Sequence, residues 1–195
     1  MQEQLSKLEK ELLLKLARLA IEDAVRGKSV KPLNLSQYPE SLRAPGVTFV
    51  TLTRKGNLRG CIGALEAHQP LAEDVREHAI AAALSDYRFP PVREDELDDL
   101  EIEISRLTPP KPLLYQTPEE LLSALRPHID GVTLMDGFKR ATFLPQVWEK
   151  LPDKERFLQH LCQKMGARPN LWHEKKLQVH TYQVEEFRES NLSTD

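Results

Sequence analysis

The sequence lacks a long apolar run, an excess of basic residues and a basic leader followed by an apolar stretch. No segment reaches the roughly 18–20 apolar residues that a membrane span requires. Residues 1–26 mix Glu and Lys with Leu, so we expect no signal peptide. The 27 Lys and Arg residues are outnumbered by 30 Asp and Glu, whereas nucleic-acid binders usually carry a clustered basic face. We therefore expect a cytoplasmic protein that binds neither a membrane nor nucleic acid.

Cysteine is also scarce, and the common catalytic and metal-binding motifs are missing. Cys61 and Cys162 lie far apart in unrelated contexts, which is typical of reduced thiols in the cytoplasm. The six histidines show no metal-site spacing. The sequence has no zinc-binding cysteine pair, phosphate loop, dinucleotide fingerprint or serine nucleophile elbow. We predict no metal site, and any cofactor stays unknown.

The first half of the chain predicts a long helix and a hairpin. Leu recurs at three- and four-residue steps over residues 4–26, which predicts an amphipathic helix that Gly27 ends. Residues 47–53 are rich in β-branched side chains and predict a strand. Residues 54–57 have the composition of a turn, so residues 58–63 would form the return strand.

A second helix and a further strand follow before a proline-rich segment. Pro70 suits the first position of a helix that runs to about Leu84. Residues 101–107 alternate strictly, which predicts a strand with one buried and one wet face. Prolines make residues 108–117 a stiff connector. The chain would thus be a single domain, residues 1–195, whose connector separates two lobes.

The second half mixes short helices with strands. Thr117 would cap a helix with proline at its first position. Residues 129–142 indicate strand, turn and strand, with the turn at Asp136-Gly137. Asp153 would cap a helix, and residues 178–184 would form the last strand. Without a regular βαβ rhythm, these elements predict an α+β fold, an antiparallel sheet flanked by helices with a smaller second lobe.

The segment Leu58–Gly63 is the strongest candidate for chemistry. It reads Leu-Arg-Gly-Cys-Ile-Gly and places Cys61 between two glycines. A nearby cation such as Arg59 would raise the thiolate fraction of Cys61 and make it a nucleophile. The alternative is an inert, buried thiol, because free cysteine is among the most buried residue types.

The backbone of the same segment offers a second use. Consecutive N–H groups around Gly60 and Gly63 would form an anion-binding concavity, to which Arg59 adds charge. Glycine-rich segments also serve merely to turn a chain tightly. The sequence leaves both uses open.

Three residues after this segment are further candidates. Asp86 and Arg88 would bind either each other or a substrate that needs both a donor fork and an acceptor. His78 follows Asp74 by one helical turn, which is typical of a partly buried, hydrogen-bonded histidine. It would orient or activate Cys61 if the fold brings the two together.

Residues 94–103 include seven acidic side chains. Such a run is usually a solvated face, and the alternative is a docking surface for a basic partner.

Five segments together resemble the AMMECR-type family, whose bacterial and archaeal members are called AmmeMemoRadiSam system protein A. They are Gly46–Leu52, Leu58–Gly63, Asp86–Pro91, Ile102–Ser105 and Thr142–Val147. They occur in the family's order and cover nearly the whole chain, and Leu-Arg-Gly-Cys-Ile-Gly is the family's hallmark.

The resemblance implies an α+β domain with an antiparallel sheet, helices around it and a smaller second lobe. The resemblance does not identify a reaction for this protein. The genomic neighbourhood of the family suggests two partners. They are a Memo-type protein, which resembles class III extradiol dioxygenases, and a radical SAM protein. The chain would act with them in one pathway or modification system.

Two hypotheses about function follow. In the first, the protein is a cysteine-dependent enzyme for an anionic small molecule or protein substrate. Its catalytic residues would be Cys61, His78 and Asp86, and its substrate-binding residues would be Arg59, Gly60, Gly63 and Arg88. In the second, it is a non-catalytic ligand-binding or scaffold protein that docks the Memo-type and radical SAM partners.

Overall fold

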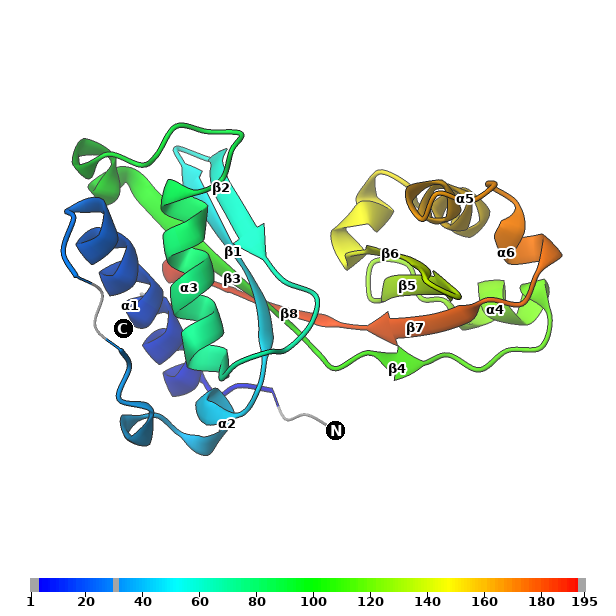
Figure 1. Ribbon diagram of the computed structural model, residues 1–195, viewed down its shortest axis with the longest axis horizontal. Helices are drawn as coiled ribbons and strands as arrows, with labels where there is room; N and C mark the ends of the chain where they lie inside the picture. Colours follow the sequence, from blue (N-terminus) through cyan, green and yellow to red (C-terminus); the bar gives the residue numbers. More distant parts are fainter. Residues whose placement is uncertain (1–3, 30–31, 193–195) are drawn as a thin grey trace. The chain divides into compact units, whose positions relative to one another are not determined.

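The computed structural model describes residues 4–29 and 32–192, which form two compact units (Figure 1). The first unit contains the described residues up to Leu107 and those from Glu185 onward, and the second unit spans Thr108–Val184. Each unit has helices and a four-stranded antiparallel sheet, so the predicted α+β class is confirmed. Residues 1–3, part of the segment assessed for a signal peptide, lie outside the described residues.

The first unit packs its helices on a sheet of strand order β2-β1-β3-β8. Its helices are α1 (Lys7–Val25), α2 (Glu40–Arg43), α3 (Leu71–Leu84) and α7 (Glu189–Leu192), with 3-10 helices η1 (Leu35–Gln37) and η2 (Glu94–Asp99). Its strands are β1 (Val47–Arg54), β2 (Asn57–Gly63), β3 (Leu100–Leu107) and β8 (Val184–Arg188).

Helix α1 begins three residues later than predicted because of a capping box. The Ser6 side chain accepts a hydrogen bond from the Glu9 N–H, and the Glu9 carboxylate accepts one from the Ser6 N–H at 2.7 Å. Together these bonds satisfy two N–H groups that have no partner within the helix. Gly27 follows the helix with φ +68°, as the prediction of a glycine stop requires.

The β1–β2 hairpin turns at Lys55 and Gly56, which have φ 51° and 79°. Two consecutive residues with positive φ form a turn whose twist matches that of the two antiparallel strands it joins. The register shifts further along, where Leu52 pairs with Gly60 and Thr53 pairs with Leu58. Arg59 is therefore an extra residue in β2, and its side chain leaves the regular alternation.

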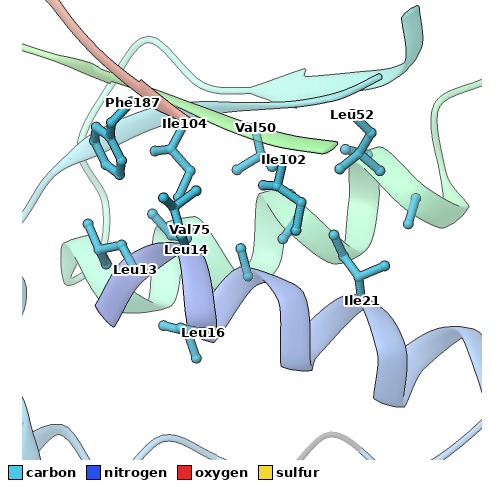
Figure 2. Packing of buried hydrophobic residues seen from close by; sticks show 14 of the residues in the cluster. Leu13, Leu14, Leu16, Ile21, Val50, Leu52, Val75, Ile102, Ile104 and Phe187 are labelled. Carbon is cyan, nitrogen blue, oxygen red and sulfur yellow. The ribbon is translucent and has the colours of Figure 1, made fainter. Parts of the chain in front are cut away.

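Helices α1 and α3 cover one face of this sheet and bury the core of the first unit. Val75 on α3 packs with residues of β1, β3, β8 and α1 (Figure 2). Figure 2 labels these as Leu13, Leu14, Leu16, Ile21, Val50, Leu52, Ile102, Ile104 and Phe187. Alternate residues of β1 and β3 face the helices, which explains the period-two pattern of both strands.

The strict alternation predicted for residues 101–107 is wrong at the end of β3. Ser105, Arg106 and Leu107 are all buried in succession. Arg106 Nη1 lies 3.3 Å from Glu185 Oε2, so a charged partner accompanies the buried guanidinium. A buried charge needs such a partner because the interior solvates it poorly.

The second unit has a sheet of strand order β4-β7-β5-β6. Its strands are β4 (Lys111–Pro112), β5 (Gly131–Asp136), β6 (Lys139–Phe143) and β7 (Gln178–Tyr182). Its helices are α4 (Pro118–Ala124), α5 (Lys154–Lys164) and α6 (Leu171–Glu174), with the 3-10 helix η3 (Pro145–Glu149). In its core the rings of Trp148 and Phe157 stack with centroids 3.6 Å apart.

Several predicted elements of the second half are confirmed. Thr117 and Asp153 cap α4 and α5, and proline occupies the first turn of α4. The hairpin turn lies one residue later than predicted, because Asp136 pairs with Lys139 and leaves Gly137 and Phe138 in the turn.

The strand predicted over residues 178–184 is present as β7, but it is shorter than predicted and is not the last strand. Strand β7 ends at Tyr182, and β8 begins at Val184 in the other sheet. The connector predicted near residues 108–117 includes β4, which pairs with β7 in the second unit. Among residues 4–29 and 32–192, no helix is both long enough and apolar enough to cross a membrane.

Candidate functional site

The two glycines of the hallmark segment allow close packing. A Cβ built on Gly60 would lie 2.1 Å from the backbone oxygen of Ala82 in α3. A Cβ on Gly63 would lie 2.3 Å from the ring of Phe49. No side chain fits at either position, so glycine lets the helix and the ring approach β2.

Cys61 lies on the sheet face opposite to the packed helices. It pairs with Thr51 across the hairpin, whereas its neighbour Gly60 faces α3. The Thr51 hydroxyl donates a hydrogen bond to Cys61 Sγ at 3.3 Å. The thiol is half-buried and free of any disulfide.

The backbone of Cys61 is held on both sides by one ion pair. The Cys61 N–H donates to Asp86 Oδ2 at 2.8 Å, and the Cys61 carbonyl accepts from Arg88 Nη2 at 3.3 Å. The amide that would bind an anion in a glycine-rich turn is therefore already bonded to a carboxylate. The Asp86–Arg88 pair fixes the position of Cys61 on the strand.

Asp86 and Arg88 bind each other in a fork. Asp86 Oδ1 accepts from Arg88 Nε at 2.9 Å, and Asp86 Oδ2 accepts from Arg88 Nη2 at 2.6 Å. These bonds, together with those from the Cys61 and Arg88 backbone N–H groups, outweigh desolvation and hold the pKa of Asp86 well below its usual range. The same hydrogen bonds raise the pKa of Arg88. Asp86 therefore stays charged at neutral pH.

Arg88 also faces solvent. Its side chain is 43% exposed, whereas the side chain of Asp86 is buried. In the described part of the chain, no hydrogen bond involves Nη1 of Arg88, so two of its N–H donors are open to a ligand. A guanidinium edge of this kind suits a carboxylate or a phosphate.

Arg59 is bound elsewhere. Its Nη2 lies 2.9 Å from Glu96 Oε2, and its Nη1 and Nη2 also donate to the carbonyls of Pro90 and Pro91. The two side chains of this ion pair are only 12% and 7% exposed. The hydrogen bonds from Arg59 lower the pKa of Glu96 to about 2. Arg59, which is two residues from Cys61 in the sequence, thus joins β2 to η2.

Glu96 also corrects the interpretation of residues 94–103 as a solvated face. It is buried, and it accepts further hydrogen bonds from Arg54 Nη1 and from the Arg93 N–H. The neighbouring Asp95 and Asp98 are exposed. One member of the acidic run is therefore structural.

His78 is engaged by its own helix. Its Nδ1 lies 3.2 Å from Asp74 Oδ2, as the one-turn spacing predicted. The same carboxylate oxygen accepts from the Thr48 N–H and hydroxyl at 2.8 and 2.7 Å. His78 therefore belongs to a network that joins α3 to β1, and no described hydrogen bond joins it to Cys61.

The structure thus brings together three of the predicted site residues, Cys61, Asp86 and Arg88. It also adds Thr51, which sequence reasoning missed. Counting back from the hairpin turn would not have paired Thr51 with Cys61, because the extra residue at Arg59 shifts the register by one. Within residues 4–29 and 32–192, no group of three or more His, Cys, Asp or Glu is arranged to hold a metal ion.

Comparison with known proteins agrees with the resemblance seen in the sequence. The AMMECR1 family model matches residues 14–187. A protein of Methanothermobacter thermautotrophicus is 42% identical over 187 residues, which is 95% of this chain and 96% of that protein. A protein of Methanocaldococcus jannaschii is 37% identical over 180 residues, 89% of this chain and 86% of that protein.

A solved structure has the same fold. The crystal structure of an uncharacterised protein from Pyrococcus horikoshii superposes with a TM-score of 0.79 and 35% identity, covering 95% of this chain and 93% of that chain. The family model and the relatives span most of the sequence, including the hallmark segment. The chain therefore belongs to the AMMECR1 family.

Proposed function

We propose that this AMMECR1-family protein is a cysteine-dependent enzyme that acts on an anionic small molecule or protein substrate. The observation that carries the proposal is the position of the Cys61 thiol. The thiol is half-buried and accepts a hydrogen bond from the Thr51 hydroxyl. The half-exposed Arg88 donates a hydrogen bond to the carbonyl of the same residue, Cys61. Cys61 is the nucleophile, and Arg88 Nη1 binds the anionic group.

Two polar groups lie next to Cys61. The Thr51 hydroxyl donates a hydrogen bond to its sulfur, and the Arg88 guanidinium donates one to its carbonyl. A cation and a hydrogen-bond donor close by are features of nucleophilic cysteines.

Asp86 acts as a positioning residue in this proposal. Its lowered pKa leaves it without a proton to give near neutral pH, and its two oxygens already accept hydrogen bonds from Cys61 and Arg88. The substrate-binding role of Arg59 would require that it leave Glu96. We therefore propose Arg88 as the principal anion-binding group.

The cellular setting is part of the same proposal. We place the protein in the cytoplasm, in a pathway shared with a Memo-type protein and a radical SAM protein. The resemblance to the AmmeMemoRadiSam system supports this placement.

The test is the pH dependence of iodoacetamide labelling in the native protein, followed at each cysteine by mass spectrometry. Cys162 is the internal control, because burial raises the pKa of its thiol. We expect Cys61 to label rapidly below about pH 7, under the ~8.5 of a free thiol. Arg88→Gln should shift this profile to higher pH. Labelling of Cys61 only after unfolding would contradict the proposal, as would full function in vivo of Cys61→Ser.

Exposed apolar side chains favour a second candidate function, a scaffold that docks its partners. Leu58, the first residue of the hallmark segment, and Leu65, which follows the segment, are exposed. Tyr87, between Asp86 and Arg88, is 95% exposed. In this second function, these side chains would contact the partner. If this function holds, Tyr87→Ser should abolish co-purification with the Memo-type or radical SAM protein, whereas Cys61→Ser should retain it.

A further inference from the structure

The face of the first sheet that carries Cys61 has a row of polar side chains across all four strands. Figure 2 shows apolar residues of β1, β3 and β8 packed toward α1 and α3, so the residues that alternate with them lie on the opposite face. On that face Thr51 pairs with Cys61 of β2 on one side and with Glu103 of β3 on the other. Glu103 Oε2 in turn lies 2.6 Å from Arg188 Nε of β8.

The hydrogen bonds of Cys61 set the spacing along this row. Its N–H and carbonyl bond to Asp86 and Arg88, and thus point away from β1. Cys61 and Thr51 are therefore a non-hydrogen-bonded pair, the closer of the two kinds of antiparallel pair, and Thr51 and Glu103 form a hydrogen-bonded pair. These spacings place the Cα atoms of Cys61 and Glu103 roughly 10 Å apart. A small molecule bound at the thiol would therefore reach the Glu103 carboxylate.

Glu103, the last member of the acidic run, lies in surroundings with too little positive charge. Its side chain is only 20% exposed, and burial raises its pKa. The charge of Arg188 opposes this effect, but the carboxylates of Glu186 and Glu101 raise the pKa of Glu103 further. The single ion pair therefore does not compensate the carboxylate fully.

The ion pairs of Asp86 and Glu96 show the opposite balance. Hydrogen bonds from their arginine partners outweigh desolvation and lower the pKa of both carboxylates. Among residues 4–29 and 32–192, Arg188 is the one cation described within ion-pair distance of Glu103, and its side chain is half-exposed. A second cation beside Glu103 would therefore gain a favourable interaction.

A structural role explains part of this arrangement. Opposite charges on neighbouring strands stabilise a sheet, so Glu103 and Arg188 would attract each other on any open sheet face. That role needs one carboxylate for one guanidinium. It accounts neither for the surplus of negative charge around Glu103 nor for its alignment with Thr51 and Cys61.

From these features we infer that Glu103 is a specificity-determining residue of the Cys61 site and binds a cationic group of the substrate. The inference rests on the function proposed above. The anionic group of the substrate binds Arg88 Nη1, its ammonium or guanidinium group binds Glu103, and its reacting atom lies between them at the thiol. The substrate is therefore a zwitterion rather than a simple anion.

The experiment measures how the charge of a thiol reagent affects its reaction with Cys61 in the whole, folded protein. The probes are the 2-aminoethyl, 2-sulfonatoethyl and 2-hydroxyethyl methanethiosulfonates, which are cationic, anionic and neutral. Each forms a mixed disulfide with the thiolate and releases methanesulfinate. Mass spectrometry gives the rate constant at Cys61. Division by the rate constant of the neutral reagent removes differences in accessibility and in thiolate fraction between variants.

Three variants test the two charged ends of the site. Glu103→Gln should lower the cationic-to-neutral ratio about two- to fivefold, the size expected for one partly exposed charge pair. Arg188→Gln removes the cation that competes for Glu103 and should raise the same ratio. Arg88→Gln should lower the anionic-to-neutral ratio instead. Because the first two variants break the same ion pair, a merely structural role would affect both alike.

Glu94→Gln is the matched control. It removes one negative charge from an exposed glutamate that bonds to Arg26, and it should leave both ratios unchanged. A fall in the cationic ratio equal to that of Glu103→Gln would mean that only net charge matters, and the inference would be overturned. Circular dichroism shows whether each variant is folded.

The outcomes separate this inference from the function on which it rests. An unchanged cationic ratio in Glu103→Gln, or a change of the same sign in Glu103→Gln and Arg188→Gln, overturns the role of Glu103. Rapid reaction of Cys61 with the neutral reagent would then still support the enzyme. If none of the three reagents reacts with Cys61 in the folded wild-type protein, the proposed function fails and this inference fails with it.

Discussion

The guanidinium of Arg59 and the carboxylate of Glu96 form a buried ion pair, with Nη2 2.9 Å from Oε2. The pair joins β2 to η2, and it takes up the charge that lies nearest to Cys61 in the sequence. Breaking such a pair leaves the remaining charge poorly solvated.

We therefore expect Glu96→Gln to lower the free energy of unfolding by about 2–3 kcal/mol. Asp95→Asn on the same 3-10 helix is the control, because both Asp95 and its partner Arg93 are exposed, and it should change stability by less than about 0.5 kcal/mol. Urea unfolding of the two variants measures the difference. Similar losses in both would mean that the buried pair contributes no special stability.

The contact between Gly60 and the backbone of α3 predicts a large effect of one methyl group. The clashing atom is the Ala82 oxygen, a backbone atom that cannot rotate away. Gly60→Ala should destabilise the protein by about 2–4 kcal/mol through overpacking. Gly56→Ala, at a turn with open space, should cost only about 1 kcal/mol from its positive φ. Thermal unfolding measures both variants. If Gly56→Ala lowers the melting temperature more than Gly60→Ala does, the close approach of Gly60 to α3 is wrong.

The lowered pKa of Asp86 predicts a loss of stability in acid. Its pKa is lower in the folded protein than in the unfolded chain, so its stabilisation is present above the ordinary value of about 3.9 and is lost as pH falls through and below it. Wild-type protein should therefore lose stability between pH 6 and pH 3. Asp86→Asn should be less stable at pH 6 and lose less on acidification.

Urea midpoints at the two pH values give the comparison. Asp95→Asn serves again as the control and should keep the full loss. An equal acid loss in Asp86→Asn and wild type would show that Asp86 is not the group responsible.

Cys162 is buried among the apolar residues of the second unit, and burial raises the pKa of its thiol. Cys162→Ser places a hydroxyl in this core and should destabilise the protein by about 1–3 kcal/mol, whereas Cys162→Ala should cost less. Calorimetry of both variants tests the order. A serine variant as stable as the alanine variant would contradict an apolar site.

Sequence reasoning succeeded where a structure depends on neighbouring residues. The β-branched run of β1, the Asp153 cap of α5 and the glycine after α1 are local features, and each was predicted. The glycines of the hallmark segment were singled out, but not for their actual contacts. Those contacts come from Ala82 and Phe49, on other elements.

By itself, then, the sequence determined the α+β class, most helix and strand positions and the family. Only the tertiary structure determined which charged residues lie next to one another. The extra residue in β2 lets Arg59 reach Glu96, while the Asp86–Arg88 pair folds back onto the backbone of Cys61. Likewise, β8 joins the first sheet after the chain has completed the second unit. Such pairings link residues far apart in the chain, and local patterns carry no information about which distant partner lies nearest.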